Sequence, residues 1–187
     1  GSDYCLGHLL NTPGNFTASK LAWVKQNEPD RYAQIDKMML PGDFISMKLT
    51  GEITTTIAAL SEGIFWDFKN KTIAAAVMEY YGLDAQHIPV IKNVFDTHGY
   101  LTENVAEELG LPKGIPVTYK AGDQQNNALS LNVLNPGEVA ATAGTSGVIY
   151  GVIDTLAYDQ QSRVNTFAHV NHTETQNRLG VLLCING

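Results

Sequence analysis

The 187-residue sequence has few cysteines and no long apolar run, and each absence argues against a class of protein. Its two cysteines, Cys5 and Cys184, belong to no CxxC or Cys/His ligand spacing, so we expect two reduced, buried thiols in a cytoplasmic protein. No apolar run approaches the roughly 20 residues that span a bilayer. The N-terminus also lacks a basic segment followed by an apolar one. The sequence therefore predicts neither a membrane span nor a signal peptide.

Positive charge is scarce as well. The sequence has 12 Lys and Arg against 19 Asp and Glu, which gives a formal net charge of −7. Because no cluster of Lys or Arg is present, nucleic acid and anionic membranes are poor candidate partners. Hydrophobic residues make up 44% of the chain and charged residues 17%, which is typical of a folded globular protein rather than a disordered one.

The first part of the chain, to about Gly110, has mostly helical patterns. Apolar residues recur at helical spacing between cap residues, and glycines follow two of these segments. We expect Trp23, Trp66 and Tyr80 to lie in the core. Pro41 to Asp43 reads as a turn, and residues 115–119 read as a strand. The predicted helices run from Asn15 or Thr17 to Asn27, over 29–40, over 44–49, over 73–81 and over 101–109.

The second part changes to short strands. Residues 138–143, 148–153, 164–169 and 179–185 have apolar strand patterns, which predict an antiparallel meander and an α/β fold. We place a domain boundary near Tyr119, between residues 1–119 and 120–187. The last strand is followed by Asn186 and Gly187, a turn or helix-start signal. We therefore expect a fragment of a longer protein, with a sheet surface that favours self-association, so that a homodimer is a candidate assembly.

A polar loop at residues 122–127 could carry chemistry. Asp123 follows a predicted strand and Gly122, and it precedes the small and apolar run 128–131. One interpretation is structural: Asp is a preferred helix N-cap. The other is functional: the carboxylate would accept a proton from a bound hydroxyl, while the neighbouring amides hold other hydroxyls. The residues alone leave both open.

The turn formed by Gly144, Thr145, Ser146 and Gly147 joins two predicted strands. It can be a plain hairpin turn, or its backbone N–H groups and hydroxyls can converge on a phosphate. It matches neither a P-loop nor a dinucleotide-binding glycine motif. The two motifs lie on consecutive elements at a predicted domain boundary, where binding sites are favoured.

Five motifs follow one another along the chain: Phe16 to Leu21 with Trp23, then 41–52, Gly122-Asp123-Gln124, Gly144 to Gly147, and 162–169. Their types and order resemble the FGGY family of sugar kinases, and within it the xylulokinases, over about residues 8–187. Asn15 stands where that pattern usually has Gly or another small or aromatic residue. Gln124 replaces the Asn of many xylulokinases and makes the loop similar to that of glycerol kinases.

The resemblance implies two actin-like, ribonuclease-H-like domains with ATP and sugar in the cleft between them. Residues 1–119 would form the C-terminal part of the N-terminal, sugar-binding domain, and 120–187 the start of the C-terminal, nucleotide-binding domain. The helical part of the first domain would thus precede the opening β-meander of the second.

In this family Asp123 would be the catalytic base, Asp123 and Gln124 would contact the sugar, and Gly144, Thr145, Ser146 and Gly147 would hold the ATP phosphates. Mg²⁺ would bridge those phosphates, and no residue of this chain is expected to ligate a metal. The first phosphate hairpin, with the acid that helps hold magnesium, and the adenine site are expected outside this chain, so the isolated chain should be inactive.

The implied reaction converts D-xylulose and ATP to D-xylulose 5-phosphate and ADP. Kinases of glycerol, ribulose or gluconate are alternatives within the family. A non-catalytic actin-like module that binds nucleotide or sugar is the alternative from another class.

Overall fold

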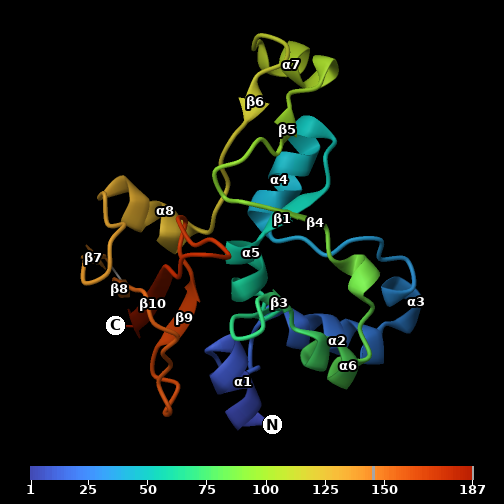
Figure 1. The fold of residues 1–187 in the computed structure, drawn as a ribbon. Coiled ribbons are helices and arrows are strands. Elements are labelled where there is room, and N and C mark those ends of the chain that lie inside the picture. The colour runs from blue at the N-terminus through green and yellow to red at the C-terminus, as the bar shows by residue number, and fades with distance from the viewer. Residues whose placement is uncertain (145, 187) are drawn as a thin grey trace.

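The computed structural model describes residues 1–144 and 146–186 and shows a mixed α/β chain in which helices precede a four-stranded sheet (Figure 1). The helices are α1 (Ser2–Leu9), α2 (Thr17–Asn27), α3 (Pro29–Tyr32), α4 (Pro41–Thr50), α5 (Ile57–Glu62), α6 (Ala75–Tyr81), the 3₁₀ turn η1 (Ala85–His87), α7 (Glu103–Leu109) and α8 (Asp123–Ser130). The strands are β1 (Thr54–Thr56), β2 (Trp66–Asp67), β3 (Thr72–Ile73), β4 (Val90–Lys92), β5 (Gly99–Tyr100), β6 (Pro116–Val117), β7 (Val139–Ala143), β8 (Ser146–Ile153), β9 (Asn165–Ala168) and β10 (Leu179–Asn186). The predicted α/β class is confirmed.

Local signals set several helix ends. The side chain of Thr56 accepts a hydrogen bond from the Ala59 N–H (3.1 Å), which satisfies one of the free donors at the start of α5. Helices α6 and α7 end before Gly82 and Gly110, whose φ angles of 61° and 66° form left-handed caps that cost glycine little. These two helix ends are confirmed.

The predicted helix over 29–40 is wrong beyond Tyr32. Residues 35–40 follow an irregular path, and the Met38 N–H bonds to the His87 carbonyl (2.8 Å). Pro41 is the first residue of α4 rather than part of a turn. A proline disfavours helical backbone at the residue before it, here Leu40, but suits the first turn of a new helix.

Only one of the three aromatic residues expected in the core is buried. Trp66 is 4% exposed, whereas Trp23 and Tyr80 are 57% and 83% exposed on α2 and α6. Helix α2 buries Ala18, Leu21 and Ala22 instead. The prediction is wrong for Trp23 and Tyr80, because both helices turn small or aliphatic positions inward.

Strands β7, β8, β10 and β9 lie side by side in that order, and every neighbouring pair is antiparallel. The predicted antiparallel sheet is confirmed, but its strand order is not that of a meander, because β10 lies between β8 and β9. The long connection over residues 154–164 allows β9 to lie at the edge of the sheet, so that the position beside β8 is left for β10. The central pair, β8 with β10, is in register from Ile153 opposite Leu179 to Ser146 opposite Asn186.

Two buried polar side chains attach the sheet to the helical part. The Asn11 side chain donates to the Thr166 carbonyl (2.7 Å) and accepts from the Thr166 N–H (3.0 Å), so it occupies part of the outer edge of β9. The Ser61 hydroxyl accepts from the Ala168 N–H (2.9 Å) and ties α5 to the same strand. One apolar cluster accordingly includes Leu60 of α5 and Leu179 of β10. These contacts fix the sheet relative to α5.

The sheet face that carries Leu179 also presents apolar side chains that are exposed. Val139, Ile149 and Ile185 lie on β7, β8 and β10, and they are 58%, 41% and 49% exposed. Cys184 is also exposed, which corrects the expectation of two buried thiols; Cys5 is buried as expected.

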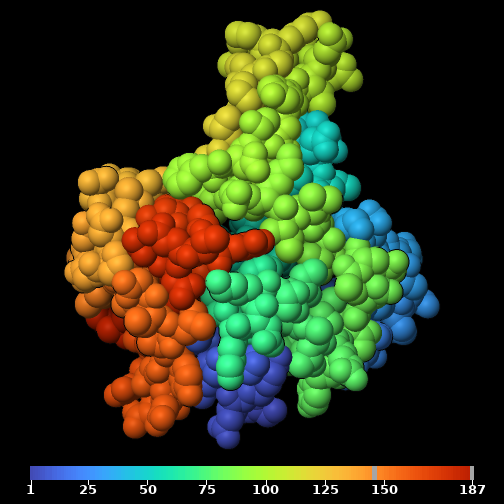
Figure 2. Space-filling view, in the orientation of Figure 1, coloured from blue at the N-terminus to red at the C-terminus, as the bar shows by residue number. Residues whose placement is uncertain are grey.

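Strands β5 and β6 and helix α7 form an arm that projects from the rest of the molecule (Figures 1 and 2). Its two strands pair antiparallel, Gly99 with Val117 and Tyr100 with Pro116. The predicted strand over 115–119 is therefore confirmed only at Pro116 and Val117. Within residues 1–144 and 146–186, the helices are too short or too polar to cross a membrane.

Candidate functional site

Asp123 is the first residue of α8, and Gly122 before it is the helix N-cap. The Asp123 carboxylate accepts hydrogen bonds from the backbone N–H of Gln124 (2.9 Å) and from its side-chain amide (3.2 Å). The interpretation of Asp123 as the N-cap is therefore wrong. A carboxylate in the first turn still interacts favourably with the positive end of the helix dipole. Its side chain is exposed, so a ligand can reach it.

Two cavities adjoin Asp123. The larger one has a volume of about 460 Å³ and lies between α4, α5 and the start of α8. The smaller one, about 270 Å³, lies between α2, α5, α8 and the strands β9 and β10. Three residues line both: Leu40, Glu62 and Asp123. Cavities of this size suit a small molecule, and Asp123 stands at the junction of the two.

Glu62 is the second carboxylate at this junction, and the sequence reasoning missed it. Its Oε1 accepts a hydrogen bond from the Gln125 side chain (2.8 Å). Burial raises the pKa of Glu62 to about 7, against the effect of the Gln125 bond and with further contributions from the charges of Asp123 and Asp43. A lone Glu in the small and apolar run 57–64 was the only sequence signal that could have identified it.

The packing of this junction favours glycine at the N-cap. A Cβ at position 122 would overlap the Glu62 Oε1 and would lie 2.6 Å from the Gln125 Oε1. Gly122 therefore lets the start of α8 approach α5 closely, which brings the carboxylates of Asp123 and Glu62 to one wall.

The two glutamines after Asp123 have different environments. Gln124, predicted to contact the sugar, is partly exposed and lines the smaller cavity together with Phe167 and Leu182. Gln125 is 2% exposed and is held by Glu62. Gln124 is thus available to a ligand, whereas Gln125 bridges α8 to α5.

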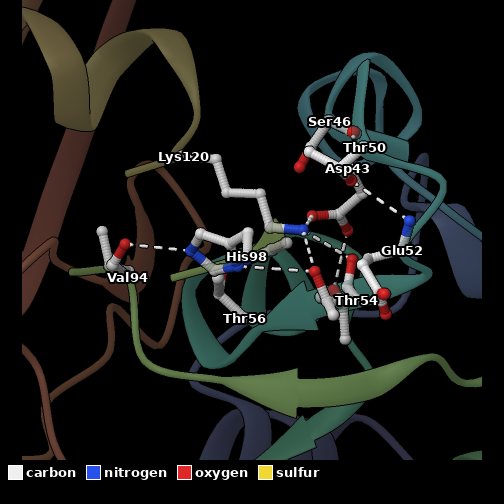
Figure 3. Close-up of polar contacts among 11 residues, drawn as sticks. Asp43, Ser46, Thr50, Glu52, Thr54, Thr56, Val94, His98 and Lys120 are labelled. Carbon is white, nitrogen blue, oxygen red and sulfur yellow. Dashed lines mark hydrogen bonds and ion pairs between the residues drawn. The ribbon is translucent and has the colours of Figure 1, made fainter. Parts of the chain in front are cut away.

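A buried ion pair between Lys120 and Asp43 forms part of the lining of the larger cavity, and Figure 3 shows its contacts. The Lys120 amino group lies 2.8 Å from Asp43 Oδ1 and donates to the carbonyl (2.6 Å) and hydroxyl (2.9 Å) of Thr54. The other Asp43 oxygen accepts from the Thr55 hydroxyl (2.7 Å). Burial lowers the pKa of Lys120, and the hydrogen bond and charge of Asp43 oppose that effect. This pair joins α4 and β1 to the segment that leads into Asp123, and the sequence reasoning missed it.

The predicted phosphate turn lies at the β7–β8 hairpin. Gly144 is exposed at a bend after β7, and Gly147 of β8 is paired with Ala143. Thr145 lies outside the described residues. The linings of the two cavities beside Asp123 include neither Gly144 nor Gly147. The structure therefore brings Asp123 and Gln124 together with Glu62, and it places neither Gly144 nor Gly147 in the linings of the same cavities.

Among residues 1–144 and 146–186, no group of three or more His, Cys, Asp or Glu side chains could hold a metal ion. Mg²⁺ commonly binds one or two carboxylates together with phosphate oxygens and water, without an all-protein cage. An ion that enters already bound to nucleotide phosphates therefore needs no such group in the described part of the chain.

Comparison with known proteins assigns this chain to a family. Residues 7–130 match the sequence profile of the FGGY family of carbohydrate kinases, N-terminal domain. The xylulose kinase of Escherichia coli (strain K12) is 28% identical over 163 residues, which cover 87% of this chain and 33% of that protein. The solved structure of the xylulose kinase from Rhodospirillum rubrum matches with a TM-score of 0.86 and 26% identity over 98% of this chain and 36% of that one.

Plasmodium falciparum glycerol kinase, solved with ADP, also matches with a TM-score of 0.86, over 100% of this chain and 38% of that one. At 18% identity this match shows the fold alone. The chain spans about a third of the length of the curated relatives it matches. The profile match covers more than half of this chain, and the chain therefore belongs to the FGGY family of carbohydrate kinases.

Proposed function

We propose that the complete protein that carries this chain transfers the γ-phosphoryl group of ATP to a hydroxyl group of a sugar, with D-xylulose as the acceptor and D-xylulose 5-phosphate as the product. The observation that carries the proposal is the position of Asp123, whose exposed carboxylate stands at the junction of two cavities. Membership in a family of carbohydrate kinases supplies the reaction class.

Asp123 acts in this proposal as the general base. Phosphoryl transfer depends mostly on positioning and on stabilisation of charge. A carboxylate beside the acceptor can take the hydroxyl proton as the oxygen attacks phosphorus, so that the O–P bond forms while the bond from phosphorus to ADP breaks. The bonds from Gln124 to both carboxylate oxygens orient the base, and the start of a helix gives it a rigid support.

The acceptor is proposed to lie in the cavities beside Asp123, with Gln124 as a hydrogen-bonding side chain. The nucleotide phosphates are proposed to bind the turn Gly144 to Gly147, whose backbone donors suit an anion. Mg²⁺ would enter with ATP and offset the charge of its phosphates. The two parts, 1–119 and 120–187, are proposed to belong to the two domains. The profile match runs on to residue 130, so the boundary stays a prediction.

The choice of D-xylulose rests on the xylulose kinases among the relatives. The fold does not separate acceptors, because the glycerol kinase matches with the same TM-score as the xylulose kinase from Rhodospirillum rubrum. Sequence identity favours the xylulose kinase, at 26% against 18%.

The test is ADP release by the complete protein with Mg·ATP and a panel of D-xylulose, D-ribulose, glycerol and D-gluconate. We expect D-xylulose to give the highest kcat/KM. A higher value with another sugar would replace the acceptor and keep the reaction. The absence of ADP release above the sugar-free rate, with every acceptor, would contradict the kinase assignment and favour a binding module.

A further inference from the structure

Glu62 occupies a position at the site that the reaction proposed above does not use. It is the last residue of α5 and lines both cavities, directly across from the start of α8. The Gln125 side chain donates to its Oε1 (2.8 Å). Within the described part of the chain this is the one hydrogen bond to the Glu62 carboxylate, so Oε2 remains available to a ligand.

The charges around Glu62 indicate which ligand that oxygen would accept. Asp123 and Asp43 line the larger cavity with it, and Lys120, the cation on the same wall, is already paired with Asp43 at 2.8 Å. An ionised carboxylate accepts a hydrogen bond from a hydroxyl group strongly and repels another anion. Five ionisable side chains line the cavities with Glu62 or interact with its charge: Asp43, Asp123, Lys20, Lys120 and Tyr150.

We propose that Glu62 is a specificity-determining residue of the acceptor site. Its carboxylate accepts a hydrogen bond from a hydroxyl group of an uncharged polyhydroxy acceptor, and it disfavours an acceptor of the same length that carries a carboxylate. This inference rests on the proposed function, because it takes the cavities beside Asp123 as the acceptor site.

A purely structural role for Glu62 is the alternative, since the Gln125 bond joins α5 to α8. The substitution Glu62→Gln separates the two roles. A carboxamide oxygen can still accept from Gln125, so the bridge is kept while the negative charge is removed. Glu108→Gln makes the same chemical change at an exposed position of α7, on the projecting arm, and serves as the matched control.

The experiment measures equilibrium binding by isothermal titration calorimetry on the complete protein, without ATP, at pH 8. The probes are D-xylulose and D-xylonate, which have the same number of carbons but differ in charge. We expect the wild-type protein to bind D-xylulose at least about 10-fold more tightly than D-xylonate, the size of one charge-assisted hydrogen bond. Glu62→Gln should reduce that ratio at least about fivefold, mainly through weaker D-xylulose binding, and Glu108→Gln should leave it unchanged.

Thermal melting checks that each variant is folded. A Glu62→Gln protein that keeps the wild-type ratio overturns the proposal, as does a wild-type protein that binds D-xylonate as tightly as D-xylulose or binds neither probe. ADP release is scored separately. If one of those binding results is found but ADP is released with some other sugar, the kinase assignment stands and the role of Glu62 is refuted. The expected binding ratios without any release would support Glu62 and contradict the kinase assignment.

Discussion

Replacing Lys120 by Met should destabilise the protein strongly. Both partners of the Lys120–Asp43 pair are buried, with 7% and 3% of their side chains exposed. Met keeps most of the length of the side chain but removes all three contacts of the amino group, two of them to Thr54. Asp43 would retain only the Thr55 hydroxyl as a partner (2.7 Å). Removing one member of a buried pair leaves an uncompensated charge, which costs about 3–5 kcal/mol of unfolding free energy.

The assay is urea unfolding at pH 7, followed by far-UV circular dichroism and by the fluorescence of buried Trp66. The matched control is Lys113→Met, which removes an exposed pair with Glu103, where 67% and 78% of the side chains are accessible. Such a pair contributes about 0–1 kcal/mol. The double variant Lys120→Met with Asp43→Asn should recover part of the loss, because the stranded charge is gone. The reasoning is refuted if Lys120→Met costs no more than Lys113→Met.

Two further predictions concern the junction of the cavities. The pKa of Glu62 is raised from 4.5 to about 7, so the folded protein holds this proton more tightly than the unfolded chain, and ionisation costs folding free energy. The unfolding free energy of the wild-type protein should therefore fall by about 3 kcal/mol relative to that of Glu62→Gln as pH rises from 4.5 to 7. Urea unfolding of both proteins at pH 4.5, 5, 6, 7 and 8 measures this difference, and equal dependence on pH would contradict the prediction. Gly122→Ala should lower the unfolding free energy by only about 1 kcal/mol, since the ends of the Glu62 and Gln125 side chains can move aside. It should nevertheless raise the KM for the acceptor severalfold. Melting curves and KM measured together check it, and an unchanged KM would count against the close approach.

Much of the fold follows from local signals in the sequence. Gly82 and Gly110 end helices through their own backbone conformation, and Thr56 caps α5 within three residues. Asp123 could be placed at a strand-to-helix junction because a glycine and a run of polar residues precede a helical pattern. Each of these features depends on residues close together in the chain.

The parts that could not be predicted depend on distant segments. Glu62 meets Gln125 across 63 positions of sequence, and nothing near Glu62 distinguishes it from a solvated side chain. Asp43 is ordinary in its own segment, and only the fold brings Lys120 to it. The place of β10 between β8 and β9 is likewise set by pairing over the whole sheet rather than by any turn.

The central claim is that Asp123 is the general base of phosphoryl transfer. Asp123→Asn keeps the size of the side chain and most of its hydrogen bonds but cannot accept the proton. In the complete protein we predict that kcat for ADP formation with D-xylulose falls by roughly 10²–10⁴, with a smaller change in KM and a nearly unchanged melting temperature. A folded Asp123→Asn protein that retains near-normal kcat would contradict the account.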